Sequence, residues 1–154
     1  MANKTVPASE FRGVKDFRDL EVWAWCRELR RDVEAMCERL PRPEQTRLAD
    51  QMIRAARSVT ANLAEGFGRH HYRETVQSCR MARGSLFELL DHFVVASDKS
   101  YLKPAEFEAF ENRIRSGIKL LNGFVRYLQS RKDGAGEKRE REQVSRSTNK
   151  PVNR

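Results

Sequence analysis

The chain has 154 residues, of which 39% are hydrophobic and 34% are charged, and its formal net charge at pH 7 is +8. This length and composition predict one folded domain with polar extensions, and the basic charge favours polyanionic partners such as nucleic acid. No apolar run approaches the roughly 20 residues that cross a membrane, and the N-terminal residues lack the apolar core of a secretory signal, so we expect a cytoplasmic protein with no membrane contact.

The first helix is predicted over residues 17–40, after a flexible N-terminal arm formed by residues 1–14. Pro41 and Pro43 are expected to end it, because proline cannot continue a helix interior. Its apolar residues recur in steps of three and four, which is the spacing of one buried helix face: Val22, Cys26, Leu29, Val33, Met36 and Leu40.

The second helix is predicted to begin at residue 43 or 44 and to end at residue 67. Pro43 suits the first turn of a helix, where its missing N–H has no partner in any case. Gly66 and Gly68 are expected to break the helix at its other end. The predicted apolar face consists of Leu48, Met52, Ala55, Val59, Leu63 and Phe67.

Two further helices are predicted over residues 72–97 and 104–131. Tyr101 and Leu102 lie in the loop between them and are expected to fold back onto the core. The fourth helix has the most regular apolar face of the chain, and near-heptad spacing suits neighbours that cross at about 20°: Phe107, Phe110, Ile114, Ile118, Leu121, Val125 and Leu128.

Residues 133–154 differ from the rest, because valine is their one large apolar residue type and many are charged. Such a segment buries too little surface to order itself, so it is predicted to be a disordered basic tail. Residues 15–132 then form the domain. Short connections make neighbouring helices antiparallel, and the predicted fold is all-α, an up-down-up-down four-helix bundle.

Small residues on the second helix and the Ala82-Arg83-Gly84-Ser85 segment of the third allow two backbones to approach closely. Gly84 inside a helix costs about 1 kcal/mol relative to alanine, so either tight packing between these helices or a subunit contact should offset it. Polar residues lie near the same surface, and a buried carboxylate needs donors or a cation. We predict a structural polar network formed by Asn62, Glu65, Ser58 and Ser85.

Basic residues are the candidate nucleic-acid-binding site. Arg115, Lys119 and Arg126 are spaced by four and seven, so they form one stripe on the fourth helix, with Arg113 beside it. A line of cations can follow phosphates and release counterions; the alternative is a solvated helix face. A second, shorter basic patch on the second helix is formed by Arg47, Arg54 and Arg57.

Trp23 lies off the apolar face of the first helix, so it is predicted either to anchor a subunit interface or to cover the edge of the bundle. The three cysteines have no C-x-x-C spacing, and we expect reduced core thiols. His70, His71 and Cys79 do not show zinc-site spacing, so no metal and no cofactor is predicted. With no P-loop and no G-x-S-x-G, the sequence favours a protein that is not an enzyme.

The chain resembles the four-helix-bundle family of 23S rRNA intervening-sequence proteins. A sister group of that family comprises the accessory variability determinant proteins of diversity-generating retroelements. The resemblance spans residues 17–128 and departs from the family pattern at His71 and Thr75. It is carried by Phe17-Arg18-Asp19-Leu20-Glu21-Val22-Trp23, Leu40-Pro41, Gln51, Arg54, Ala55, Ser58, Asn62, Ala64, Glu65, Gly66, Arg69, Glu74, Ala82, Gly84, Ser85, Glu88, Leu89 and Tyr101-Leu102.

This resemblance implies an antiparallel bundle that assembles as a ring-shaped homopentamer. For the retroelement group it also implies binding to a reverse transcriptase and to nucleic acid. The leading hypothesis is therefore a bacterial, non-enzymatic oligomer that binds structured nucleic acid, with RNA expected, through basic helix faces. The alternatives are an adaptor for a reverse transcriptase and a self-assembling bundle without nucleic-acid affinity.

Overall fold

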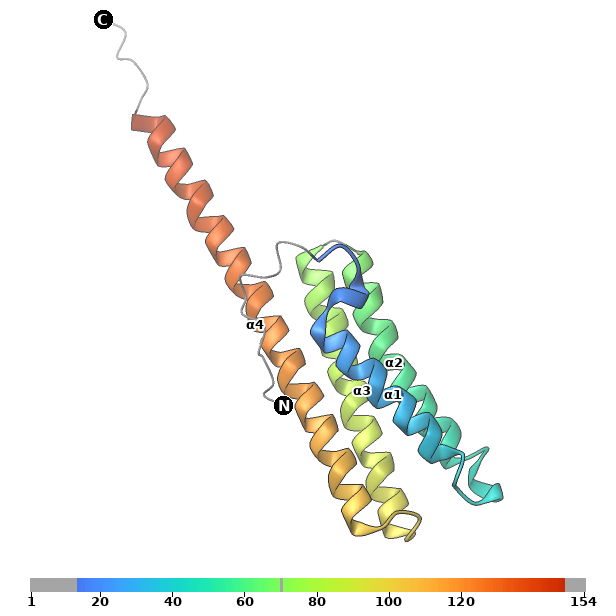
Figure 1. The fold of residues 1–154 in the computed structure, drawn as a ribbon. Coiled ribbons are helices and arrows are strands. Elements are labelled where there is room, and N and C mark those ends of the chain that lie inside the picture. Colours follow the sequence, from blue (N-terminus) through green and yellow to red (C-terminus); the bar gives the residue numbers. More distant parts are fainter. Residues whose placement is uncertain (1–13, 70, 149–154) are drawn as a thin grey trace, which may run out of the picture.

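The computed structural model describes residues 14–69 and 71–148, with side chains described as far as Arg131. Consecutive helices run in opposite directions (Figure 1), and each packs against its neighbours, with the last helix also against the first. The predicted all-α, up-down-up-down bundle is thus confirmed. Its elements are η2 (Phe17–Asp19), α1 (Glu21–Cys37), η3 (Arg42–Glu44), α2 (Leu48–Gly68), α3 (Tyr72–Asp98) and α4 (Pro104–Thr148).

The first predicted helix is divided into a short turn and α1. Asp16 caps the turn by accepting from the backbone N–H of Arg18 at 2.9 Å, and the Asp19 carboxylate accepts from the N–H of Asp16 at 3.1 Å. Leu20 follows in extended conformation, with its side chain only 2% exposed, and α1 begins after it. The prediction missed this break because the capping box stands inside the predicted helix.

The second helix begins at Leu48, later than predicted. The Gln45 side-chain amide donates to the carbonyls of Cys37 at 2.9 Å and Leu40 at 2.8 Å. These bonds satisfy carbonyls that the end of α1 leaves without a helical partner. The chain is held in a turn by this cap, so Pro43 belongs to η3 and not to the first turn of α2.

Gly66 was expected to break α2, but the helix continues through Gly68 and neither glycine has a positive φ. Gly66 is instead a contact point with α3. A Cβ added there would lie 2.7 Å from the Cβ of Ser78. The Thr75 hydroxyl donates to the Gly66 carbonyl at 2.9 Å, which ties the first turn of α3 to the end of α2.

All four long helices contribute to the core. Val33, Met52, Leu86, Phe93 and Ile114 are fully buried. The rings of Phe93 and Phe110 stack with centroids 4.4 Å apart, joining α3 to α4. The loop before α4 closes the core at this end, because Leu102 is buried there and Tyr101 is partly buried, as predicted.

Helix α1 meets α4 through Trp25. Its indole N–H donates to the carbonyl of Arg113 at 3.1 Å, and a Cβ at Gly117 would lie 3.4 Å from its ring. Glycine at this position therefore leaves room for the indole. The contact places Trp25 in the α1–α4 seam, and Trp23 lies on the opposite, α2-facing side of α1.

Helix α4 has 45 residues and extends beyond the predicted end at residue 131. The segment after residue 131 leaves the other three helices (Figure 1). Its composition explains both facts. Glu, Lys, Arg and Gln have high helix propensity, so the backbone can continue, but they offer no apolar face to bury.

Candidate functional site

Three of the four predicted network residues lie together between α2 and α3. The hydroxyls of Ser58 and Ser85 are 2.9 Å apart, and the Asn62 amide donates to the Ser58 carbonyl at 2.8 Å and to its hydroxyl at 3.1 Å. Asn62 and Ser85 are buried. These bonds satisfy polar groups that would otherwise be costly in the helix contact.

Glu65 does not join this network. Its side chain is 51% exposed and pairs with Arg69 at 2.7 Å, one turn later on α2. The prediction assumed a buried carboxylate, but position 65 points to solvent. A pair of this kind on an exposed helix face contributes little to stability.

Four of the seven predicted nucleic-acid-binding residues, all of them arginines, already have carboxylate partners. Arg113 pairs with Asp32 of α1, and Arg57 pairs with Glu34 of α1 at 2.8 Å. Within single helices, Arg115 pairs with Glu111 at 2.6 Å and Arg54 with Asp50 at 3.6 Å. Their charge is partly compensated, so the predicted stripe on α4 is weaker than its residue count indicates.

Lys119, Arg126 and Arg47 have no carboxylate partner in the described part of the chain and are exposed. Lys119 and Arg126 lie two turns apart on α4. Arg47 lies just before α2, at the end of the bundle near η3. Lys119 and Arg126 therefore define the stronger candidate surface on α4.

The sequence analysis missed that α3 adds two more cations to this surface. Arg83 of α3 donates to the Asn122 side-chain oxygen of α4 at 3.1 Å. The helices are antiparallel, so one turn back on α3 matches one turn forward on α4. This register puts Arg80 of α3 at the level of Arg126 of α4. We call the set the basic seam: Arg80, Arg83, Lys119, Asn122 and Arg126.

A sequence signal for the seam exists. Residues 75–87 and 112–132 contain no Asp or Glu. When two segments without acidic residues lie side by side on adjacent antiparallel helices, their basic residues form one surface. Counting the charges of α4 alone does not reveal this surface, because two of its four cations come from α3.

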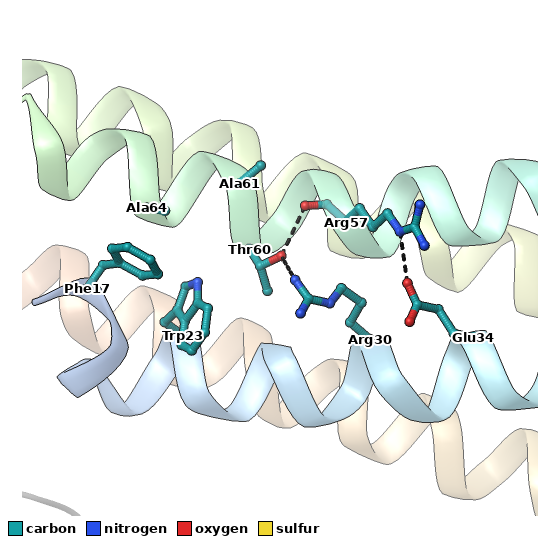
Figure 2. A pocket seen from close by; sticks show the side chains of 8 residues that line it. All are labelled: Phe17, Trp23, Arg30, Glu34, Arg57, Thr60, Ala61 and Ala64. Atoms are coloured by element: carbon teal, nitrogen blue, oxygen red, sulfur yellow. Dashed lines mark hydrogen bonds and ion pairs between the residues drawn. The ribbon is translucent and has the colours of Figure 1, made fainter.

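Trp23 lines an open groove of about 590 Å³ between α1 and α2. Figure 2 shows Phe17 and Trp23 on one wall of the groove's apolar end, opposite Ala64 of α2. The two rings meet edge to face with centroids 5.0 Å apart. The Trp23 indole N–H is shielded and has no acceptor among the described residues. One subunit therefore leaves this donor unsatisfied.

The other end of the groove is charged. Arg30 donates to the Thr60 hydroxyl at 2.8 Å, and Thr60 donates to the carbonyl of Arg57 at 3.1 Å. Arg57 and Glu34 pair across the groove (Figure 2). In all, eight residues line what we call the α1/α2 groove: Phe17, Trp23, Arg30, Glu34, Arg57, Thr60, Ala61 and Ala64.

The cysteines lie in the core as reduced thiols, as the sequence predicts. Burial raises the pKa of Cys26 to about 12 and those of Cys37 and Cys79 to about 11. Within the described residues no cluster of three or more His, Cys, Asp or Glu side chains could hold a metal ion. No helix of the described part is long and apolar enough to span a membrane.

The fold and these surfaces can be compared with known proteins. A family model described as 23S rRNA-intervening sequence protein matches residues 18–123, well over half of the chain. The chain belongs to the 23S rRNA-intervening sequence protein family. No curated protein matches it. The matched region includes α1, α2, α3 and the packed part of α4, so this family member carries Arg80, Arg83 and Lys119 inside the family domain and Arg126 just beyond it.

Proposed function

We propose that this protein is a non-enzymatic, oligomeric bundle that binds structured nucleic acid, RNA in particular, through the basic seam. The observation that carries the proposal is that four cations without carboxylate partners among the described residues lie at matching levels along α3 and α4. Arg83 is fixed there by its bond to Asn122. Cations without carboxylate partners keep their full attraction for phosphate, whereas paired ones must first lose a partner.

The form of binding follows from the residues of the seam. None of its five residues is aromatic, and its side chains offer mainly charge. Recognition of backbone shape by charge, without base reading, is the mode that these groups support. In a homo-oligomer, with five subunits as the resemblance implies, the seam repeats in each subunit, so that weak single contacts add through multivalency.

The test measures binding of a labelled RNA stem-loop by fluorescence anisotropy over a salt series. The variant is Arg80→Gln, Lys119→Gln and Arg126→Gln combined. Removal of three phosphate contacts should reduce the slope of log K against log salt by about two to three units. The affinity should fall most at low salt.

The control removes the same number of charges from paired arginines. Arg18, Arg39 and Arg69 pair with carboxylates at 2.6, 2.8 and 2.7 Å, so Arg18→Gln, Arg39→Gln and Arg69→Gln combined should change the slope far less. Equal losses in both variants would assign binding to net charge and not to the seam. A wild-type protein that binds no RNA at low salt would reject nucleic-acid binding itself.

A further inference from the structure

Helix α3 exposes apolar residues along one face. Met81 is 53% exposed, Phe87 51%, Val94 40% and Val95 38%, and no other large apolar side chains of the described residues are this exposed. Each of positions 81, 84, 87, 88, 91, 94 and 95 lies three or four residues from another of the set, so they share that face. Several large apolar side chains exposed on one helix face indicate a binding surface. We call the four apolar residues the α3 ridge.

Gly84 lies in the middle of the ridge and has no packing role within the subunit. A Cβ added there would have no neighbour within 4 Å. The expected tight contact between α2 and α3 therefore does not explain this glycine, which costs about 1 kcal/mol inside a helix. The missing side chain at Gly84 leaves a notch between Met81 and Phe87, where the backbone or a ring of another subunit can approach closely. A subunit contact is then the remaining explanation for this glycine.

The α1/α2 groove is complementary to the ridge in polarity. Its apolar end offers the rings of Phe17 and Trp23 beside the small side chains of Ala61 and Ala64, which leave space for an incoming side chain. An aromatic residue such as Phe87 fits a pocket formed by rings and alanines. The groove has room for it, with a volume of about 590 Å³.

The two surfaces are also complementary in charge. Glu88 and Asp91 stand among the apolar residues of the ridge. The Glu88 carboxylate lies 3.7 Å from the His92 ring nitrogen, and Asp91 has no cation partner among the described residues. On the groove side, Arg30 is bonded only to the neutral Thr60 hydroxyl among the described residues, whereas Arg27 already lies 4.0 Å from the Glu28 carboxylate. Acidic groups would thus meet basic ones when ridge and groove join.

A single chain cannot join its own two surfaces. The groove lies between α1 and α2, whereas the ridge lies on the solvent side of α3, the helix diagonal to α1 in the bundle. We infer that the α3 ridge of one copy docks into the α1/α2 groove of a second copy, an inference that rests on the proposed oligomer. A contact between unlike surfaces repeats from copy to copy and closes into a ring when the rotation allows it.

Site-specific cross-linking tests the pairing. The variants are Phe87→Cys on the ridge and Ala61→Cys in the groove, treated with a short bis-maleimide. The native cysteines are buried with raised pKa values, so the new thiol is the reactive one. Neither variant alone should form covalent dimers. Their mixture should form dimers, and a chain that carries both substitutions should form a ladder of covalent multimers.

Glu38→Cys is the matched control, because residue 38 is exposed at the end of α1 and outside the groove. Mixed with Phe87→Cys, it should give no dimer. Unfolding midpoints and light scattering verify that each variant folds and assembles. Dimers in either single variant would show a symmetric contact and overturn the inference.

The outcomes also separate this inference from the proposed function. An oligomer by light scattering that shows no ridge-to-groove cross-link overturns the docking alone. A wild-type monomer at all concentrations overturns the docking together with the proposed assembly. RNA binding by the seam is measured separately and can hold in either case, because neither substituted position belongs to the seam.

Discussion

At the residue scale, Gly66 and Gly84 occupy helix interiors for opposite reasons. Gly66→Ala would place a Cβ 2.7 Å from Ser78, so α2 and α3 must shift apart. Gly84→Ala meets open space and gains helix propensity. We expect Gly84→Ala to raise the free energy of unfolding by about 0.5–1 kcal/mol and Gly66→Ala to lower it by about 1–3 kcal/mol.

Urea denaturation of dilute protein, followed by circular dichroism, measures both changes with little contribution from subunit contacts. A loss of stability in Gly84→Ala would mean that the notch is filled within one subunit. Gly84→Ala should also weaken assembly at higher concentration, since the added methyl group fills the notch that the second copy approaches.

The buried thiols set a second expectation at this scale. Their pKa values are raised from 9.0 to about 11 or 12, so these thiols stay protonated in the folded protein at a pH where the thiols of the unfolded chain ionise. Their contribution to stability is complete below pH 9 and is lost as pH rises towards 11. A thiol reagent at pH 8 should label native protein slowly and urea-unfolded protein at three sites. Rapid labelling of the native protein would contradict the burial of these cysteines.

At the element scale, the hydroxyl bridge between Ser58 and Ser85 joins α2 to α3. Each single alanine substitution leaves a partly buried group without its partner, at a cost of about 1 kcal/mol. The double substitution removes both groups and should cost less than the sum of the two. Denaturation midpoints of the four proteins give the coupling. Ser130→Ala is the control, because that hydroxyl is exposed and bonds only within α4; strict additivity at Ser58 and Ser85 would reject the bridge.

The helices were predictable from sequence because apolar spacing depends on neighbours within one or two turns. The capping of η2 by Asp16 and the Gln45 cap on α1 were missed, since each depends on one polar side chain and not on apolar spacing. Gly66 was misread for a related reason. A glycine near the end of a helical pattern indicates that the helix stops there. The close contact that Gly66 allows is with Ser78 of α3, and local sequence does not reveal a contact with another helix.

At the scale of the whole molecule, the binding surface could not be predicted by counting cations. Arg113 meets a carboxylate 81 residues away and Arg57 one 23 residues away, so pairing depends on the fold. Arg83 reaches Asn122 across 39 residues to form the seam. The positive charge available to a partner is the total positive charge minus the part compensated by these long-range ion pairs. The packing of the bundle determines which pairs form.

The last prediction concerns the charged end of the chain. Beyond residue 131, α4 leaves the other helices as far as Thr148, so we expect deletion of residues 133–154 to leave the core intact. We expect the free energy of unfolding to change by less than about 0.5 kcal/mol, as for surface changes. The deletion removes six basic and four acidic residues, which lowers the net charge of +8 by two. The salt slope of RNA binding should therefore change little if the seam is the site. Deletion from residue 121 onward is the control, because it also removes Leu121, which is 1% exposed, and should destabilise the bundle strongly. If the shorter deletion alone lowers the unfolding midpoint, this segment packs on the bundle; if it alone abolishes RNA binding, the tail and not the seam holds the phosphates.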